Sequence, residues 1–215
     1  MKLESVKKKL SKLSPTWVGE KHIPSLIRQL NNAFGNSKMN FVSSRYDDAY
    51  YKNHAVIVSG LYCPRISGII PESIQITLSF PKESKKITLS KEAVRFLEMK
   101  ILRTIYHEYR HKHQQRSRPN LFIKQYEVPK GAKNRARLVY YGNTDEIDAH
   151  AYETIVEIQA GKFDINKLRR AGRIGWRECE AIFLYRLHFR KSDPRVWKRF
   201  LKKVYKNNQA MKKLG

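Results

Sequence analysis

The chain has 215 residues, of which 44 are Lys or Arg and 19 are Asp or Glu, so its formal net charge is +25. A chain of this length can bury one substantial core, and we expect residues 1–215 to form a single domain. With only Cys63 and Cys179, and no apolar run long enough for a signal peptide or membrane span, the sequence argues against a disulfide-stapled secreted domain and a membrane protein.

The first third of the chain predicts a basic arm followed by a helix and several strands. Residues 1–20 favour a flexible basic arm, because their apolar content is too small for stable insertion into a membrane. A helix is predicted near Pro24 to Phe34, with strands around residues 40–44 and 55–62. Ser73 to Phe80 alternates apolar and polar residues, which is typical of a strand with one buried face. This strand could be an edge strand that holds an extended peptide, or an ordinary core strand.

A long helix is predicted from Ser90, a candidate N-cap, through a stretch without Gly or Pro. Near its end it contains the motif H-E-x-x-H, formed by His107, Glu108 and His111. The two histidines lie one turn apart on one helix face, where both imidazoles can reach one Zn²⁺ ion. Glu108 leans over the same site and could take a proton from the polarised water. The motif therefore predicts metal-assisted hydrolysis, with a peptide bond as the natural substrate.

A catalytic zinc site needs a third protein ligand from elsewhere in the chain. The metzincin extension is missing, because Gln114 and Ser117 stand where it requires Gly and His. The segment NTDEIDAHAYE predicts a second helix, with Asn143 as its candidate N-cap and Glu146 in its first turn. Glu146 is the candidate third ligand, and His150, one turn later, could orient a metal-bound side chain. Asp148 or His150 could also take the ligand position instead.

These two motifs together resemble the gluzincin-type zinc peptidases, in which H-E-x-x-H is followed on a separate helix by E-x-x-x-D. Glu146 matches the glutamate, whereas His150 stands where the family has Asp. The spacing of Glu146, Ala149 and Tyr152 is also similar to the E-x-x-A-x-x-F segment of the ImmA/IrrE-like peptidases. The resemblance covers roughly residues 74–159. It implies that Zn²⁺ is held by His107, His111 and Glu146, with Glu108 as the catalytic base and acid.

The resemblance also implies the architecture. We expect an α+β, zincin-like fold, in which a small mixed or antiparallel sheet packs on the H-E-x-x-H helix and on the second, glutamate-bearing helix. Peptide hydrolysis develops negative charge on the substrate, which needs a hydrogen-bond donor besides the metal. The sequence does not rank the side chains within reach, which are His150, Arg110, Tyr140, Tyr141 and Tyr152.

The rest of the chain predicts two short strands and a basic helical extension. The strands, at residues 121–128 and 136–141, flank a basic loop between the two motif helices. Residues 161–215 are expected to be helical, with Asp164 capping a short piece and a helix over residues 176–189. A final helix starts after Asp193 and continues to about residue 206.

The distribution of charge is the second informative property. Five of the 19 acidic residues lie in residues 145–157, and none lies from residue 194 onward. The final helix is amphipathic, which predicts that its apolar stripe packs on the core while its basic face stays in water. That basic face could bind nucleic acid through phosphates, in a manner that weakens with salt. Its residues are Arg195, Lys198, Arg199, Lys202, Lys203 and Lys206.

The sequence leads to two functional hypotheses. The first is a zinc-dependent endopeptidase that acts on a protein substrate, with nucleic-acid-associated proteins as candidate targets. The second is a basic, nucleic-acid-binding structural protein of a virion or other nucleoprotein assembly, in which the metal site is structural or vestigial. We expect a cytoplasmic protein, or a virion component if a phage encodes it, with no membrane partner.

Overall fold

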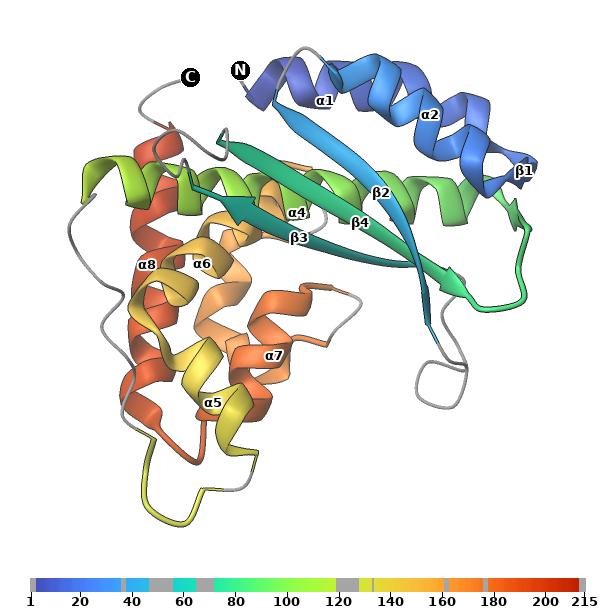
Figure 1. Ribbon diagram of the computed structural model, residues 1–215. Coiled ribbons are helices and arrows are strands. Elements are labelled where there is room, and N and C mark those ends of the chain that lie inside the picture. Colours follow the sequence, from blue (N-terminus) through green and yellow to red (C-terminus); the bar gives the residue numbers. More distant parts are fainter. Residues whose placement is uncertain are drawn as a thin grey trace. The chain divides into compact units, whose positions relative to one another are not determined.

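The computed structural model describes residues 3–35, 38–46, 56–64, 72–118, 128–132, 134–160, 163–175 and 178–212. The chain forms two compact units, Met1–Tyr109 and Arg110–Gly215, where the sequence predicts one domain. The boundary falls inside helix α4 (Lys91–Ser117), which runs unbroken from the first unit into the second (Figure 1).

The first unit contains a three-stranded mixed sheet with the strand order β2-β4-β3. Strand β4 (Ser73–Pro81) lies in the centre, parallel to β2 (Met39–Tyr46) and antiparallel to β3 (Ile57–Cys63). A separate antiparallel pair joins β1 (Gly19–His22) to β5 (Lys86–Leu89). The expectation of an α+β protein with small mixed or antiparallel sheets is confirmed.

Strand β4 shows why a period of two does not by itself distinguish an edge strand. Its alternate side chains Ile74, Ile76, Leu78 and Phe80 are all buried, as the alternation predicts. However, β4 hydrogen-bonds to a neighbour on each side, so the edge-strand alternative for residues 73–80 is wrong. Among the described strands, β3 lies at one edge of this sheet and β2 at the other.

The N-terminal residues form an ordered helix where the composition predicts a flexible arm. Helix α1 (Leu3–Leu13) leads into the short 3₁₀ helix η1 (Ser14–Trp17), and α2 (Ile23–Phe34) follows β1. Val6 and Leu10, one turn apart on α1, are fully buried. The hydroxyl groups of Ser11 and Ser14 donate to the Glu98 carboxylate of α4 at 2.9 and 2.7 Å. Buried apolar side chains at helical spacing and two hydrogen bonds to α4 therefore hold this basic segment in place.

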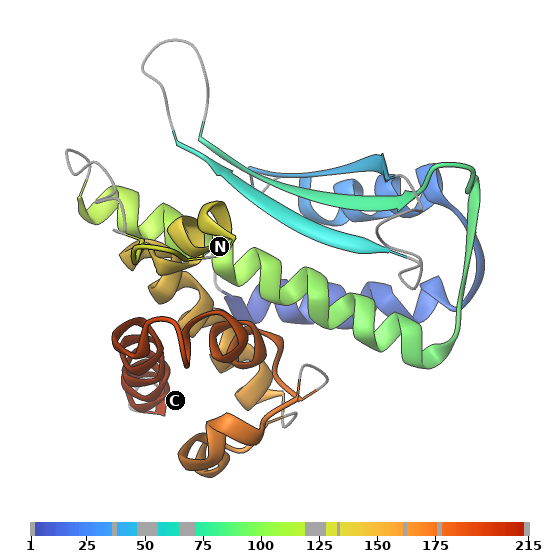
Figure 2. The same cartoon turned by 90° about the horizontal axis from the view of Figure 1, so that it is seen from below.

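Helix α4 begins as the sequence predicts. The backbone N–H of Ala93 donates to the Ser90 hydroxyl oxygen at 3.1 Å, so Ser90 is the N-cap. Figures 1 and 2 show the first part of α4 running along one face of the three-stranded sheet. Its apolar stripe is buried there, at Val94, Leu97, Ile101 and Ile105.

All the secondary-structure elements described in the second unit after α4 are helices. It comprises α5 (Arg135–Gly142), α6 (Thr144–Gln159), the 3₁₀ helix η3 (Ile165–Arg173), α7 (Glu180–Phe189) and α8 (Pro194–Lys212). The strand predicted at residues 136–141 is wrong, because this segment is α5. Its backbone closes locally, with the Leu138 N–H donating to the Asn134 carbonyl, and the spacing of Leu138 and Tyr141 suits one helix face. The strand predicted at residues 121–128 lies almost entirely outside the described residues.

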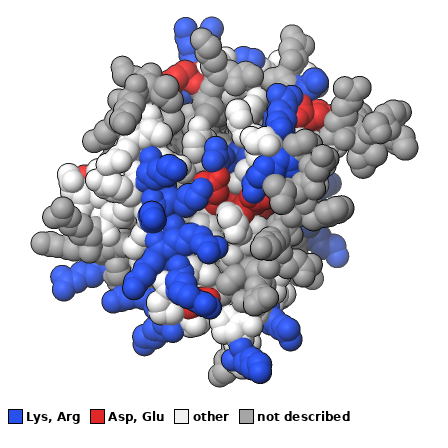
Figure 3. Space-filling view, turned by 90° about the vertical axis from the view of Figure 1, so that its left-hand side faces the viewer, with Lys and Arg blue, Asp and Glu red and all other residues white. Residues whose placement is uncertain are grey.

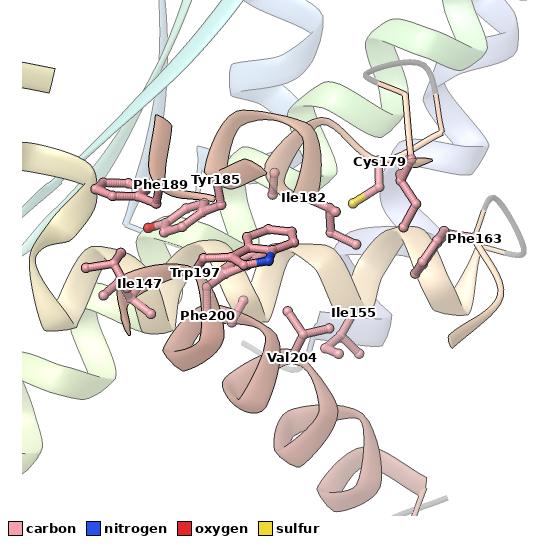
Figure 4. Close-up of a cluster of buried hydrophobic side chains, with 14 of the residues drawn as sticks. Ile147, Ile155, Phe163, Cys179, Ile182, Tyr185, Phe189, Trp197, Phe200 and Val204 are labelled. Atoms are coloured by element: carbon pink, nitrogen blue, oxygen red, sulfur yellow. The ribbon is translucent and has the colours of Figure 1, made fainter. Parts of the chain in front are cut away.

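A compact apolar cluster fills the second unit (Figure 4). The Tyr185 ring of α7 stacks on Phe200 of α8, with ring centroids 4.0 Å apart. Ile147 and Ile155 of α6 belong to the same cluster, and Val204 of α8 is fully buried in it. The predicted packing of the α8 apolar stripe on the core is confirmed, and it leaves the opposite face of α8 to solvent.

Three predicted caps are present in the second unit. The Asn143 side chain accepts from the backbone N–H of Asp145 at 2.8 Å and begins α6. Asp164 and Asp193 do the same before η3 and α8, with distances of 2.9 and 3.1 Å to the N–H groups two residues later. None of the helices in the described part of the chain is both long and apolar enough to cross a bilayer.

Candidate metal centre

Helix α6 places two metal-binding side chains one turn apart. Asn143 fixes the start of the helix, so Glu146 falls in the first turn and His150 follows at i+4 on the same side. The Nε2 atom of His150 is 3.9 Å from Oε2 of Glu146. The other ring nitrogen, Nδ1, lies 3.3 Å from Oε1 of Glu153. His150 thus has a carboxylate behind it and presents its far nitrogen toward Glu146, which is the usual environment of a metal-binding histidine.

Helix α4 contributes His111 to the same place. Its Nε2 atom lies 3.3 Å from Oε1 of Glu146, and both side chains are largely buried. The opposite nitrogen, Nδ1, is 2.9 Å from Oε1 of Gln114. Glu146 therefore has a histidine nitrogen near each of its carboxylate oxygens, from two different helices.

His107 lies one turn before His111 on the same unbroken helix, so helical geometry alone brings the two imidazoles to one side. One ligand atom each from His107, Glu146 and His150 lie within 4.8 Å of one another. Nitrogen and carboxylate oxygen are the donors that zinc accepts in catalytic sites. This group contains two of the three predicted ligands, His107 and Glu146, together with His150, the alternative ligand. The third predicted ligand, His111, lies beside Glu146 but is not one of the three.

Asp148 faces away from this group and is engaged elsewhere. Its Oδ2 accepts from Nε of Arg110 at 2.6 Å, and its Oδ1 is 3.2 Å from Nζ of Lys203. Burial by itself raises the pKa of Asp148, but Arg110 and Lys203 outweigh it and hold the pKa below its ordinary value. The alternative in which Asp148 competes as a metal ligand is therefore not supported by its contacts. The hydrogen bond from Arg110 also places the positive charge of its guanidinium against the Asp148 carboxylate.

Glu108 is packed against a strand of the first unit. It is 6% exposed, and Gly60 of β3 lies directly beside it. A Cβ atom built on Gly60 would be 2.6 Å from both Cγ and Oε1 of Glu108 and 2.7 Å from Cγ2 of Thr104. Only glycine leaves room for the carboxylate at this point of the edge strand, so β3 and α4 together set the position of Glu108.

The three tyrosines among the candidate oxyanion donors occupy different surroundings. The Tyr141 ring lies 5.3 Å from the His150 ring, and Tyr140 is half exposed beside it on α5. Tyr152 lies on α6 with its ring 5.5 Å from the Arg110 guanidinium. Burial raises the pKa of both Tyr141 and Tyr152, so each keeps its O–H donor at neutral pH. Of the three tyrosines, Tyr141 is in contact with a residue of the metal group.

Basic side chains line the solvent face of α8. The exposed members are Arg195, Lys198, Arg199, Lys202 and Lys206. Lys203 differs from them, because it is half buried and faces Asp148. Figure 3 shows one face of the molecule on which Lys and Arg gather around a smaller group of acidic side chains. The predicted nucleic-acid-binding residues therefore divide into an exposed set and one internal ion-pair member.

Three residues of this neighbourhood escape sequence reasoning. Gln114 and Glu153 each lie three residues after a histidine on the same helix, and that spacing is the signal that could have found them. Gly60 carries no such signal, because its contact with Glu108 depends on how a strand and a distant helix pack. Comparison of the chain with protein-family models, with curated proteins and with solved structures found no match.

Proposed function

We propose that this protein is a zinc-dependent peptidase of gluzincin type with a zincin-like fold. The observation that carries the proposal is the convergence of His111 and His150 on Glu146, with His107 one turn before His111 on the same helix. The sequence motifs alone do not bring these side chains together, because His111 lies on α4 whereas Glu146 and His150 lie on α6. The resemblance of the two motifs to the gluzincin peptidases supports the same reaction.

The chain's residues divide into holding and proton-transfer roles. His107, His111 and Glu146 would hold the ion. His150 would be a further ligand, at the position where the gluzincin peptidases have an orienting Asp. Zinc bound in such a site acts as a Lewis acid that makes water acidic near neutral pH. Glu108 accepts the proton from water and passes it to the leaving amine. Its burial against Gly60 keeps the carboxylate in one position for both transfers.

The edge strand β3 is the natural place for an extended substrate. Its outer edge has no strand partner among the described residues, and Glu108 lies beside its Gly60. A peptide that added to this edge by main-chain hydrogen bonds would pass close to Glu108 without dependence on particular side chains. This arrangement favours an endopeptidase that acts on unfolded or extended protein segments.

The test is a comparison of zinc content and cleavage in three proteins. Wild type is expected to contain one zinc per chain and to cleave an unfolded protein substrate. Glu108→Gln keeps the shape and the zinc but loses cleavage by at least about 100-fold, the scale of general acid–base catalysis. His111→Ala loses zinc as well as cleavage. Wild-type protein that neither contains nor takes up zinc, or Glu108→Gln that cleaves like wild type, would overturn the proposal.

The exposed basic face of α8 favours a second, compatible function. We propose that it binds nucleic acid through phosphates and so concentrates the peptidase on nucleic-acid-associated proteins. The net charge of +25 and the absence of acidic residues from residue 194 onward support this role. If the zinc and cleavage tests fail while binding persists, the structural role in a virion or other nucleoprotein assembly becomes the better explanation.

A further inference from the structure

Gln114 connects the two helices that carry the metal group. It lies on α4, three residues after His111, and is only 7% exposed. Its Oε1 is 2.9 Å from Nδ1 of His111, and its Nε2 donates to the Asp145 carbonyl at 2.9 Å and to Oδ2 of Asp148 at 3.2 Å. A single amide thus contacts a histidine of α4 and the backbone immediately before Glu146 of α6.

These contacts determine which way the amide points. A backbone carbonyl can only accept hydrogen bonds, so the group facing Asp145 must be the NH₂ of Gln114. The Asp148 carboxylate lies on the same side, between Arg110 and Lys203, and takes the second N–H. The oxygen of the amide is therefore left for His111. An amide oxygen has no proton to give, so Nδ1 of His111 must be the donor.

The tautomer of His111 follows from this hydrogen bond. A neutral imidazole with its proton on Nδ1 carries its lone pair on Nε2. Nε2 is the atom that lies 3.3 Å from Oε1 of Glu146, on the side of the metal group. The hydrogen bond also fixes the orientation of the ring, as outer partners of metal-bound histidines commonly do.

We propose that Gln114 is a positioning residue of the metal centre, which locks His111 in the Nδ1–H tautomer and ties it to the first turn of α6. The inference rests on the proposed zinc site and adds a determinant of metal affinity to it. It also gives a role to the residue that stands where the metzincin pattern requires Gly. The Asp148 carboxylate, held by two cations, keeps the Gln114 amide from flipping.

The test compares Gln114→Leu with Gln115→Leu, a neighbouring and exposed glutamine of the same helix. Zinc affinity is measured by competition with a chromophoric chelator, and apo-protein stability by chemical unfolding. Gln114→Leu should weaken zinc binding about 10- to 100-fold, the scale seen for such outer partners. Gln115→Leu should bind zinc as wild type does. Gln114→Glu, which retains an acceptor for Nδ1–H, should bind zinc more tightly than Gln114→Leu.

A measurement on the unsubstituted protein keeps the inference testable even if these variants fold poorly. Long-range ¹H–¹⁵N spectra of the zinc-loaded protein should show the proton of His111 on Nδ1; a proton on Nε2 would overturn the inference. Zinc affinity of Gln114→Leu within about twofold of wild type would also overturn it, while leaving the zinc site intact. Wild-type protein that binds no zinc would instead refute the proposed function on which the inference rests.

Discussion

The contact between Gly60 and Glu108 gives the sharpest test of how the proposed base is positioned. In Gly60→Ala, the new methyl group would lie 2.6 Å from Cγ and Oε1 of Glu108 and 2.7 Å from Cγ2 of Thr104. Carbon atoms pack at about 3.5–4.0 Å, so the methyl is about 1 Å too close to the two carbon atoms, Cγ of Glu108 and Cγ2 of Thr104. Either β3 or the Glu108 side chain must move.

The expected cost can be assembled from two opposing effects. Overpacking of this kind costs about 1–3 kcal/mol, whereas replacing Gly by Ala stabilises by about 0.4–1 kcal/mol through the unfolded chain. Gly60→Ala should therefore lower the free energy of unfolding by about 1–2 kcal/mol. With a urea slope of about 1–3 kcal/mol per molar, the unfolding midpoint falls by roughly 0.3–2 M.

Gly35 is the matched control, because a Cβ atom built there meets nothing within 4 Å and its φ of −54° suits alanine. Gly35→Ala should be neutral or slightly stabilising. The cost of Gly60→Ala should shrink when Glu108 is also changed to Ala, since residues in contact are not additive. Cleavage by Gly60→Ala should fall while zinc stays bound. A midpoint for Gly60→Ala equal to or above that of Gly35→Ala would refute the packing argument.

Three further outcomes are expected. Tyr185→Phe removes a 2.8 Å hydrogen bond to the Tyr141 carbonyl and should cost about 0.5–1.5 kcal/mol of unfolding free energy, whereas the exposed Tyr205 should tolerate the same change; equal effects would contradict this. Burial, with Arg137 as the second cause, lowers the pKa of His188. The stabilising contribution of His188 is therefore present above the ordinary histidine pKa and is lost as pH falls. In chemical unfolding measured at decreasing pH, His188→Gln should lose less stability than wild type. Binding to double-stranded DNA should weaken with salt, and each phosphate-contacting cation that is removed should reduce the slope of log binding constant against log salt concentration by about 0.9. The variant to test replaces Lys198, Lys202 and Lys206 together, and an unchanged slope would show that α8 is not part of the interface.

The features that the sequence predicts best are those that depend on residues close together in the chain. The H-E-x-x-H spacing, the caps at Ser90, Asn143 and Asp193 and the alternation in β4 all belong to single elements. Their geometry follows from the helical and extended repeats themselves. The strand prediction for the α5 segment was wrong because its short apolar run suits either a strand or a helix, and local propensity does not decide between them.

The arrangement between elements was decided only by tertiary structure. Sequence spacing on α6 puts Glu146 and His150 on one side, but the approach of His111 to Glu146 depends on how two helices pack. The same holds for the Gln114 amide, whose partners are up to 34 residues away, and for the central place of β4. Packing is a collective result of many buried apolar contacts across the chain, so no single segment encodes it.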